Sequence, residues 1–293
     1  MLHNICTFFW LIGKRIGGDF YRPSDTSTLC VRSVDLSSMV SYTKSMKNAL
    51  TIEICAGSLD DAIAAEKTGA ARIELNSSLF LGGLTPSLGS LRLVKKATKL
   101  KVMTMVRPRA AGFLYTASEF KTMEEDARLF VDNGADGIVF GFLKRDGTID
   151  EKRCEALISI AGNREKVFHR AIDVVPDPLK ALDTLINLGF TRVLTSGQEP
   201  TAYEGMELIA AMVKHAKGRI EILPGGGITK KNAAKLVQGT GVTQIHFAAL
   251  KAVAEPSTAQ NPAIYYGGAL YPPEDRFETA DLNAMTEIIG TVQ

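Results

Sequence analysis

The sequence has few cysteines, and they are not arranged as a scaffold. Only four occur in 293 residues, and none lies in a C-x-x-C pair. This spacing excludes a disulfide-rich secreted domain and a zinc finger, and it indicates a reducing compartment. We therefore expect a cytoplasmic protein that is stabilised by a hydrophobic core.

The chain also lacks an excess of charge of either sign and a long apolar run. It has 34 basic and 32 acidic residues, which argues against a nucleic-acid partner recognised through charge. An apolar run at Thr7–Ile12 is far shorter than the roughly 20 residues that span a bilayer. We expect neither a nucleic-acid partner nor a membrane span.

The small net positive charge is concentrated at the N-terminus. Residues 1–48 carry six basic and three acidic residues, a net charge of +3 that leaves −1 for residues 49–293. Residues 24–48 are rich in Ser and Thr and show no sustained apolar period. This segment is a disordered extension, an organelle-targeting segment, or the product of a start upstream of the natural one.

From Leu50 onward, short apolar strands alternate with helical segments, and strands begin about every 28 residues. The predicted strands are Thr51–Cys55, Ala71–Asn76, Lys101–Val106, Gly137–Phe140, Lys166–His169, Arg192–Thr195, Arg219–Leu223 and Gln244–Phe247. The predicted helices are Ser58–Thr68, Ser87–Thr98, Ala117–Asn133, Asp150–Ala161, Pro178–Leu188, Tyr203–Ala216, Lys231–Gln238 and Thr279–Ile289.

Eight such units with right-handed crossovers favour an α/β fold, the (β/α)8 TIM barrel, over residues 49–293. Gly69, Gly134 and Gly189 each follow a predicted helix, the usual place for a helix-ending glycine. A doubly wound open sheet is the alternative, although it usually has six strands. The Tyr- and Pro-rich segment Lys251–Phe277 would cover the barrel mouth or form a subunit contact.

Strand alternation predicts which side chains point into the barrel. Ile52 and Ile54 fit the helix-facing side, so Glu53 and Cys55 point inward, and the same argument applies to the other strands. The expected inward residues also include Arg72, Glu74, Asn76, Met103, Met105, Arg107 and His246. This interior is more polar than packing requires, and its charges need partners.

Four inward or strand-end residues are candidates for catalysis. Glu53 and Glu74 would form an acid–base pair, because burial and like charge can separate two carboxyl pKa values. His169 would act as a base with Asp173 as its orienting acid. The alternatives are ion pairs with nearby arginines for the glutamates, and a hydrogen bond to a backbone carbonyl for the histidine.

A second group suggests an anion site at the mouth. Guanidinium groups suit carboxylates and phosphates, and glycine loops after late barrel strands bring backbone N–H groups close to an anion. The candidates are Arg107, Arg109, Ser196, Gly225, Gly226 and Gly227. Internal ion pairs and a tight turn would also explain them. No lysine ends a predicted strand, so an isomerase, epimerase or hydrolase fits better than a Schiff-base aldolase.

The strand ends also carry a series of short sequence motifs, in a fixed order, between about Leu50 and His246. They are Ile52-Glu53-Ile54-Cys55, Arg72-Ile73-Glu74-Leu75, Gly82-Gly83-Leu84-Thr85-Pro86-Ser87, Met105-Val106-Arg107-Pro108-Arg109, Phe168-His169-Arg170-Ala171-Ile172-Asp173, Leu194-Thr195-Ser196-Gly197 and Pro224-Gly225-Gly226-Gly227-Ile228. Together they resemble the CutC family, named for a proposed role in copper homeostasis. The resemblance implies a cytoplasmic, self-associating TIM barrel linked to copper(I) binding or tolerance.

The resemblance also implies a copper site built from one cysteine at the end of each of the first two strands. Cys55 matches the first position, whereas Asn76 stands at the second. Copper(I) prefers two or three soft donors, so His246, His169 or Met105 would have to complete the site. Otherwise Cys55 is a small buried hydrophobe. Two functions remain open, namely copper handling and catalysis on a small anionic metabolite, and neither implies an organic cofactor.

Overall fold

The structure is a computed structural model that describes residues 50–267 and 272–293. The predicted N-terminal extension, residues 1–48, lies outside the described residues. None of the helices in the described ranges is long and apolar enough to cross a bilayer.

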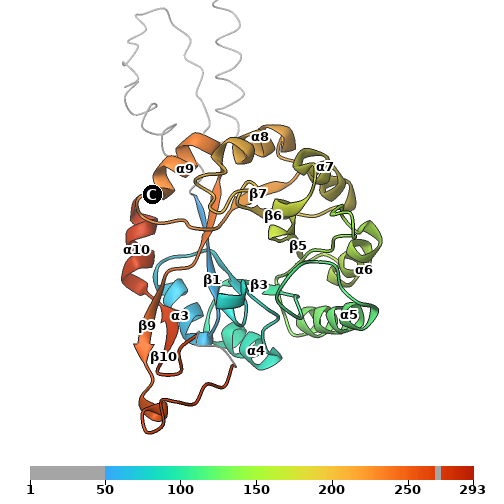
Figure 1. The fold of residues 1–293 in the computed structure, drawn as a ribbon. Helices are drawn as coiled ribbons and strands as arrows, with labels where there is room; N and C mark the ends of the chain where they lie inside the picture. Colours follow the sequence, from blue (N-terminus) through green and yellow to red (C-terminus); the bar gives the residue numbers. More distant parts are fainter. Residues whose placement is uncertain (1–49, 268–271) are drawn as a thin grey trace, which may run out of the picture. The chain divides into compact units, whose positions relative to one another are not determined.

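Eight parallel strands form a barrel in the order β7-β6-β5-β4-β3-β2-β1-β8. Figure 1 looks along the barrel axis, with the helices outside the strands. A parallel bridge between Gly225 and His246 joins the last strands and closes the ring. The predicted TIM barrel is confirmed, and every strand begins and ends within two residues of its predicted bounds. The strands are β1 (Thr51–Ala56), β2 (Arg72–Leu75), β3 (Lys101–Met105), β4 (Gly137–Phe140), β5 (Glu165–Phe168), β6 (Arg192–Thr195), β7 (Glu221–Pro224) and β8 (Gln244–Phe247).

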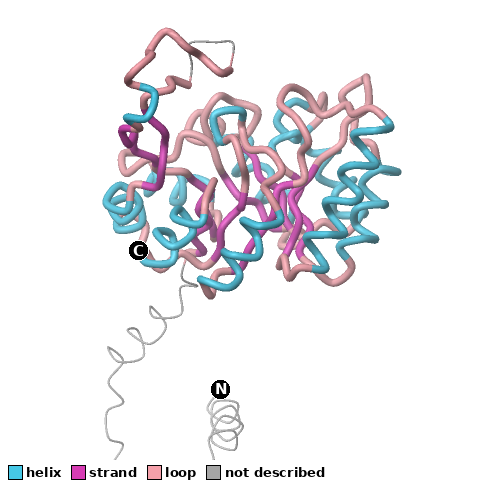
Figure 2. The backbone as a smooth tube through the Cα atoms, turned by 90° about the horizontal axis from the view of Figure 1, so that it is seen from below, coloured by secondary structure: helices cyan, strands magenta, loops and turns pink. Residues whose placement is uncertain are grey.

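Helices surround the strands, as the turned view of Figure 2 shows. Polar residues cap many of them; Thr116, for example, forms a capping box with Glu119 at the start of α5. Gly69, Gly134 and Gly189 all have positive φ after a helix, as predicted. The helices are α3 (Leu59–Lys67), α4 (Leu88–Ala97), α5 (Ala117–Asp132), α6 (Glu151–Ala161), α7 (Pro178–Leu188), α8 (Met206–Ala216), α9 (Ala233–Thr240) and α10 (Leu282–Gly290), with short 3-10 turns η1 (Leu79–Leu81), η2 (Arg170–Val174) and η3 (Pro256–Thr258).

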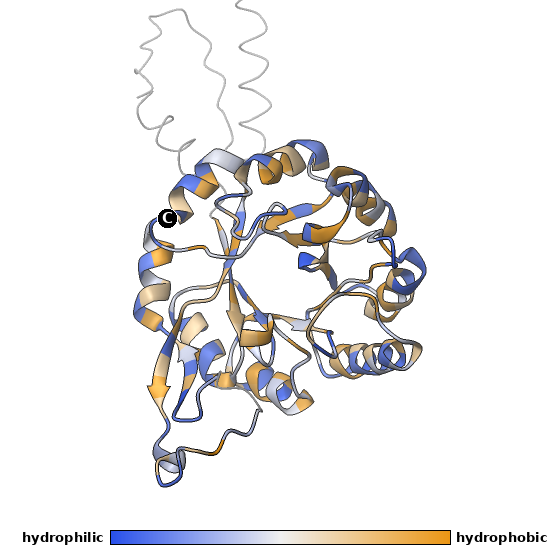
Figure 3. Cartoon of the chain, viewed as in Figure 1, coloured by the Kyte–Doolittle hydropathy of each residue, from blue (hydrophilic) through white to orange (hydrophobic). Residues whose placement is uncertain are grey.

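The main core lies between strands and helices. Ile54, Ile73 and Leu75 of β1 and β2 are fully buried, as are Leu91 and Val94 of α4. Burying such a side chain contributes about 1.5–3 kcal/mol. Figure 3 shows the consequence on the helices, around which apolar and polar residues alternate.

The barrel interior has an apolar part and a charged part. Met103, Met105, Val139 and Val167, from β3 to β5, form a small buried cluster. At the N-terminal ends of the strands, Arg192 donates to Glu165 at 2.5 Å, to Glu221 at 2.8 Å and to Gln244 at 3.1 Å. Arg72 donates to Gln244 and to Glu53. We call this network, made of Glu53, Arg72, Glu165, Arg192, Glu221 and Gln244, the floor.

A two-stranded hairpin was not predicted. The strands β9 (Leu250–Ala254) and β10 (Arg276–Ala280) pair antiparallel and project from the ring beside α3 (Figure 1). The predicted start of the last helix at Thr279 is wrong, because Thr279 and Ala280 belong to β10 and hydrogen-bond to the carboxylate of Asp61. The helix begins at Leu282 instead.

Candidate functional site

A cavity of about 770 Å³ opens at the C-terminal ends of the strands. Nine of the twelve predicted site residues line it, which agrees with the usual position of chemistry in TIM barrels. They are Cys55, Glu74, Arg107, His169, Asp173, Gly225, Gly226, Gly227 and His246. Glu53, Arg109 and Ser196 do not line this cavity, and their places are described below.

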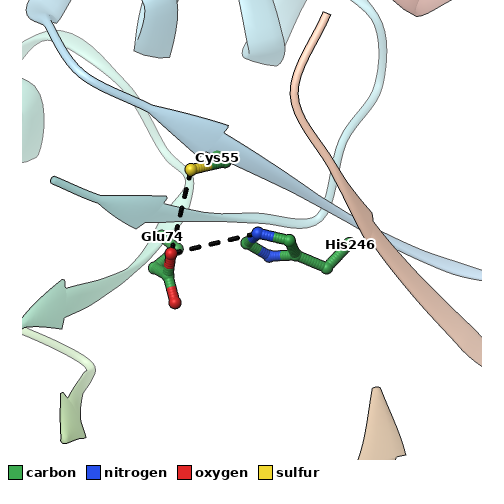
Figure 4. A group of neighbouring side chains, drawn as sticks. All are labelled: Cys55, Glu74 and His246. Carbon is green, nitrogen blue, oxygen red and sulfur yellow. Dashed lines mark hydrogen bonds and ion pairs between the residues drawn. The ribbon is translucent and has the colours of Figure 1, made fainter. Parts of the chain in front are cut away.

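Three potential metal ligands meet at this mouth: Cys55, Glu74 and His246 (Figure 4). One ligand atom from each lies within 4.8 Å of the other two. The Glu74 Oε2 atom is 3.8 Å from Cys55 Sγ and 3.9 Å from His246 Nε2. They meet because β8, β1 and β2 are adjacent and their inward side chains alternate in register. Cys55 and His246 were predicted as metal ligands, and Glu74 as a catalytic carboxyl.

Glu53 lies behind this group and holds the imidazole. Its Oε1 atom is 2.8 Å from His246 Nδ1, and its other oxygen accepts from Arg72. With Nδ1 bonded to the carboxylate, Nε2 faces Glu74 and Cys55. Gly225 leaves room for the ring, because a Cβ there would lie 3.0 Å from His246 Cδ2. A histidine oriented by a carboxylate on its other nitrogen is typical of metal sites.

The electrostatics of the two glutamates differ. Burial raises the pKa of Glu53, but the hydrogen bond from His246 and the charge of Arg72 outweigh it and hold this pKa at about 2. Burial raises the pKa of Glu74, and the charge of His246 only partly opposes the increase. Glu53 is therefore a structural anion, whereas Glu74 is a buried carboxyl that can exchange a proton. The alternative interpretation, an ion pair of Glu74 with an arginine, is not found among the described residues.

Cys55 and His246 share the proton chemistry of this group. Burial raises the pKa of the Cys55 thiol, and the hydrogen bond to His246 opposes the shift. Burial lowers the pKa of His246, but the charge of Glu74 and the bonds to Cys55 and Glu53 raise it well above 6.5. A neutral thiol beside a protonated imidazole is the expected resting state.

Asn76 completes the surroundings of the thiol. Its Nδ2 atom donates to Glu74 Oε2 at 2.9 Å and lies 3.4 Å from Cys55 Sγ. It is almost fully buried. A Cβ at Gly83 would lie 2.4 Å from its Oδ1 atom, so a glycine is needed there. The amide thus occupies the place where the family resemblance implied a second cysteine.

The predicted base–acid pair of His169 and Asp173 is not formed. Asp173 is instead ion-paired with Arg170 at 2.8 Å and accepts from Ser196. His169 Nδ1 accepts from the N–H of Ala171 at 3.3 Å. Burial and the charge of Arg107 lower the pKa of His169 to about 3, so its ring is neutral at physiological pH.

The two predicted guanidinium groups also separate. Arg107 lines the cavity, whereas Arg109 turns away to bind Glu119 at 2.5 Å and stacks on Tyr115. Pro108 lies between them, beyond the end of β3 at Met105, where the alternation of the strand no longer applies. The expectation that both arginines share the mouth is therefore wrong.

Sequence reasoning missed one cavity-lining cation, Arg170. Its Nη2 atom donates to Ser196 Oγ at 2.5 Å, and it lies beside Gly226 of the glycine loop. Gly226 and Gly227 both have positive φ. The position of Arg170 directly after a strand-end histidine was the available signal.

Comparison with known proteins agrees with this architecture. The model of the CutC family matches residues 50–251. The chain belongs to the CutC family. A CutC family protein from Treponema denticola is 77% identical over 247 residues, which cover 84% of this chain and 100% of that protein. The human copper homeostasis protein cutC homolog is 43% identical, covering 80% of this chain and 86% of its own length.

A crystal structure of a putative copper homeostasis protein CutC from Streptococcus agalactiae is similar in fold, with a TM-score of 0.65. It is 36% identical and covers 68% of this chain and 98% of that chain. CutC proteins are thus a copper homeostasis family by name, and this chain shares their barrel.

Proposed function

We propose that this CutC barrel binds one copper(I) ion through Cys55 Sγ and His246 Nε2. The observation that carries the proposal is the meeting of Cys55, Glu74 and His246 within 4.8 Å at the wall of an open cavity. The carboxylate of Glu53 on the far side of the imidazole supports it, since such a partner fixes a ligating ring.

The donor set fits copper(I) through its two softer members. Thiolate and imidazole are both copper ligands, and Met105 supplies a thioether to the same cavity. The carboxylate of Glu74 is a hard donor, so we assign it the role of offsetting the positive charge of the metal rather than that of a ligand. Binding displaces the protons of Sγ and Nε2, as metal binding to thiol and imidazole generally does.

The proposal requires a reduced thiol. Both cysteines of the described residues, Cys55 and Cys154, are free. A copper(I) site with a single thiol needs a reducing compartment, which supports the cytoplasm as the place of action.

The test is an anaerobic competition for copper(I) with bicinchoninate. Cys6 and Cys30 lie outside the described residues and are replaced by Ser in every protein. In this background, Cys55→Ser should weaken binding about 100-fold or more, and His246→Gln by about 10- to 100-fold. Cys154→Ser is the matched control, because it removes a thiol that is buried in the helix layer. Equal copper(I) affinity of the Cys55→Ser and Cys154→Ser proteins would refute the thiol site.

Catalysis on a small anionic metabolite is a second candidate. The specific observation in its favour is the carboxyl of Glu74, whose pKa is raised and which faces a cavity that also holds Arg107 and Arg170. A carboxyl of this kind suits proton transfer in an isomerase, epimerase or hydrolase. A melting-temperature screen of metal-free protein with sugar phosphates and carboxylates tests it. A shift with one anion class supports the candidate, and no shift with any anion opposes it.

A further inference from the structure

Arg107 carries a buried charge that is not neutralised. Only 7% of the residue is exposed, and its Nη atoms donate to the carbonyls of Leu81, Gly83 and Ala111 at 2.9–3.0 Å. Within residues 50–267 and 272–293, no carboxylate pairs with it, in contrast to Arg72 and Arg192 of the floor. A buried cation without a counter-ion is costly, so an anion is the missing component.

The Nε–H of Arg107 is also unused. It is buried and has no hydrogen-bond partner in the described part of the chain. An orphaned buried donor costs about 1–3 kcal/mol, which a ligand acceptor would recover.

His169 supplies a second unused donor. The residue is 3% exposed, and its Nδ1 accepts from Ala171, so the proton of the neutral ring is on Nε2. This Nε2–H has no acceptor among the described residues. A Cβ at Gly141 would lie 2.6 Å from His169 Cε1, so the glycine makes room for the ring.

The two residues that carry these donors lie in the same part of the mouth. Both residues line the mouth cavity, and both pack against Phe113, at 5.6 Å from its ring centre for Arg107 and 4.7 Å between ring centres for His169. Together they offer two N–H groups and one positive charge beside an apolar ring.

We propose that Arg107 Nε–H and His169 Nε2–H bind the carboxylate of a small organic monoanion whose apolar part packs on Phe113. A carboxylate has two oxygens, one for each donor, and its single charge matches the single unpaired guanidinium. A phosphate dianion would leave one buried negative charge unmatched, since His169 is neutral. The subsite excludes Cys55, Glu74 and His246, so it does not depend on the copper proposal.

Nitrogen-15 NMR of the histidine side chains tests the subsite directly. The chain has four histidines, and His169→Leu identifies the relevant signal. In chelator-treated protein at neutral pH, His169 should be neutral with its proton on Nε2. Titration with pyruvate should shift this signal to saturation, whereas inorganic phosphate should not. Calorimetry of the same pyruvate titration should give a dissociation constant of about 1 mM, typical of a small ligand with few contacts.

Variants separate the donors from the fold. His169→Leu and Arg107→Lys should each weaken pyruvate binding about tenfold or more, the loss of one charge-assisted bond, whereas His169→Gln keeps an N–H donor and should retain part of the affinity. His215→Leu, on α8, is the matched control and should bind pyruvate normally. Circular dichroism establishes that each variant is folded. The proposal is overturned if about 100 mM pyruvate leaves the His169 signal unchanged, or if phosphate shifts it equally. Loss of copper(I) binding in Cys55→Ser has no bearing on this result.

Discussion

The floor and the mouth of the barrel both hold buried charges, but they use them differently. In the floor, Arg72 and Arg192 each form ion pairs with carboxylates, so their positive charges are neutralised within the network. At the mouth, the side-chain hydrogen bonds of Arg107 within residues 50–267 and 272–293 go to carbonyls, and no guanidinium of these residues pairs with the carboxyl of Glu74. The floor therefore stabilises the barrel, whereas the mouth retains charges and donors with which it can bind a ligand.

Unpaired charge marks the mouth more clearly than burial or unused donors do, because Arg192 of the floor also has an unpartnered Nη1 atom among the described residues. Arg72 and Arg107 are similarly buried, at 6% and 7% exposure, yet only Arg107 has an unpartnered Nε and an unpaired charge. Glu53 belongs to both regions, since it joins Arg72 to His246. Burial alone therefore does not show that an arginine belongs to a binding site. Its hydrogen-bond and ion-pair partners have to be identified first.

The largest expected effect comes from breaking the floor at Arg72. Arg72→Met leaves the buried carboxylate of Glu53 without its guanidinium, and we expect the free energy of unfolding to fall by about 3–5 kcal/mol. Arg170→Met is the control at the mouth; the Arg170 side chain is 43% exposed, and the carboxylate of Asp173 keeps its bonds from Thr195 and Ser196, so the loss should be less than about 1 kcal/mol. Urea denaturation measures both, and equal losses would contradict the distinction between floor and mouth.

Glu53 and Glu74 allow the same comparison with one chemical change on adjacent strands. The folded pKa of Glu53, about 2, is below its ordinary 4.5, so its ionised form stabilises the fold above pH 4.5 and this contribution is lost as the pH falls towards 2. Glu53→Gln should therefore lower the free energy of unfolding by about 3 kcal/mol at pH 7.

Glu74→Gln should have no such effect. The raised pKa of Glu74 means that its ionised form is disfavoured in the fold, so the amide should leave stability at pH 7 unchanged or increase it. Chemical denaturation of both variants at pH 7 is the measurement. If Glu74→Gln loses as much stability as Glu53→Gln, Glu74 is a structural anion as well.

His169 makes the stability of the mouth sensitive to acid. The pKa of His169 in the folded chain, about 3, lies below the ordinary 6.5. Between these two values the unfolded chain binds a proton at His169 and the folded chain does not. The resulting stabilisation is complete above pH 6.5 and decreases as the pH falls, by about 2 kcal/mol at pH 5. His169→Gln should lack this part of the decrease between pH 7 and pH 5 in urea denaturation, and His215→Gln should retain it. An unchanged decrease in His169→Gln would mean that the ring is protonated in the fold.

Strand alternation predicted most of the inward residues correctly. Glu53, Cys55, Glu74 and His246 all point inward because side chains alternate strictly along a strand. The partners of these residues could not be predicted. The contact of Arg192 with Gln244, for example, depends on the register and closure of strands far apart in the sequence.

Predictions failed where the strands end. Arg109 turns outward because its position is set by the loop and by Glu119, and the two-residue period no longer applies. His169 is neutral because of burial and the charge of Arg107, and its proton lies on Nε2 because the η2 turn presents the N–H of Ala171 to Nδ1. The hairpin of β9 and β10 was missed because its two short strands are separated by a long connection that contains the clustered tyrosines and prolines.

The smallest expected effect concerns strain in the loop that holds Arg107. Ala111 has a φ of +69°, and its carbonyl accepts from Arg107 at 3.0 Å. A left-handed alanine costs about 1–2 kcal/mol, and Ala111→Gly relieves this cost while making the unfolded chain more flexible by about 0.5–1 kcal/mol. We expect Ala111→Gly to leave the free energy of unfolding unchanged or slightly increased. Ala110→Gly makes the unfolded chain more flexible without relieving strain in the fold, so it should lower the free energy of unfolding by about 0.5–1 kcal/mol. Equal destabilisation of both variants in urea would show that the mouth loop stores no strain at Ala111.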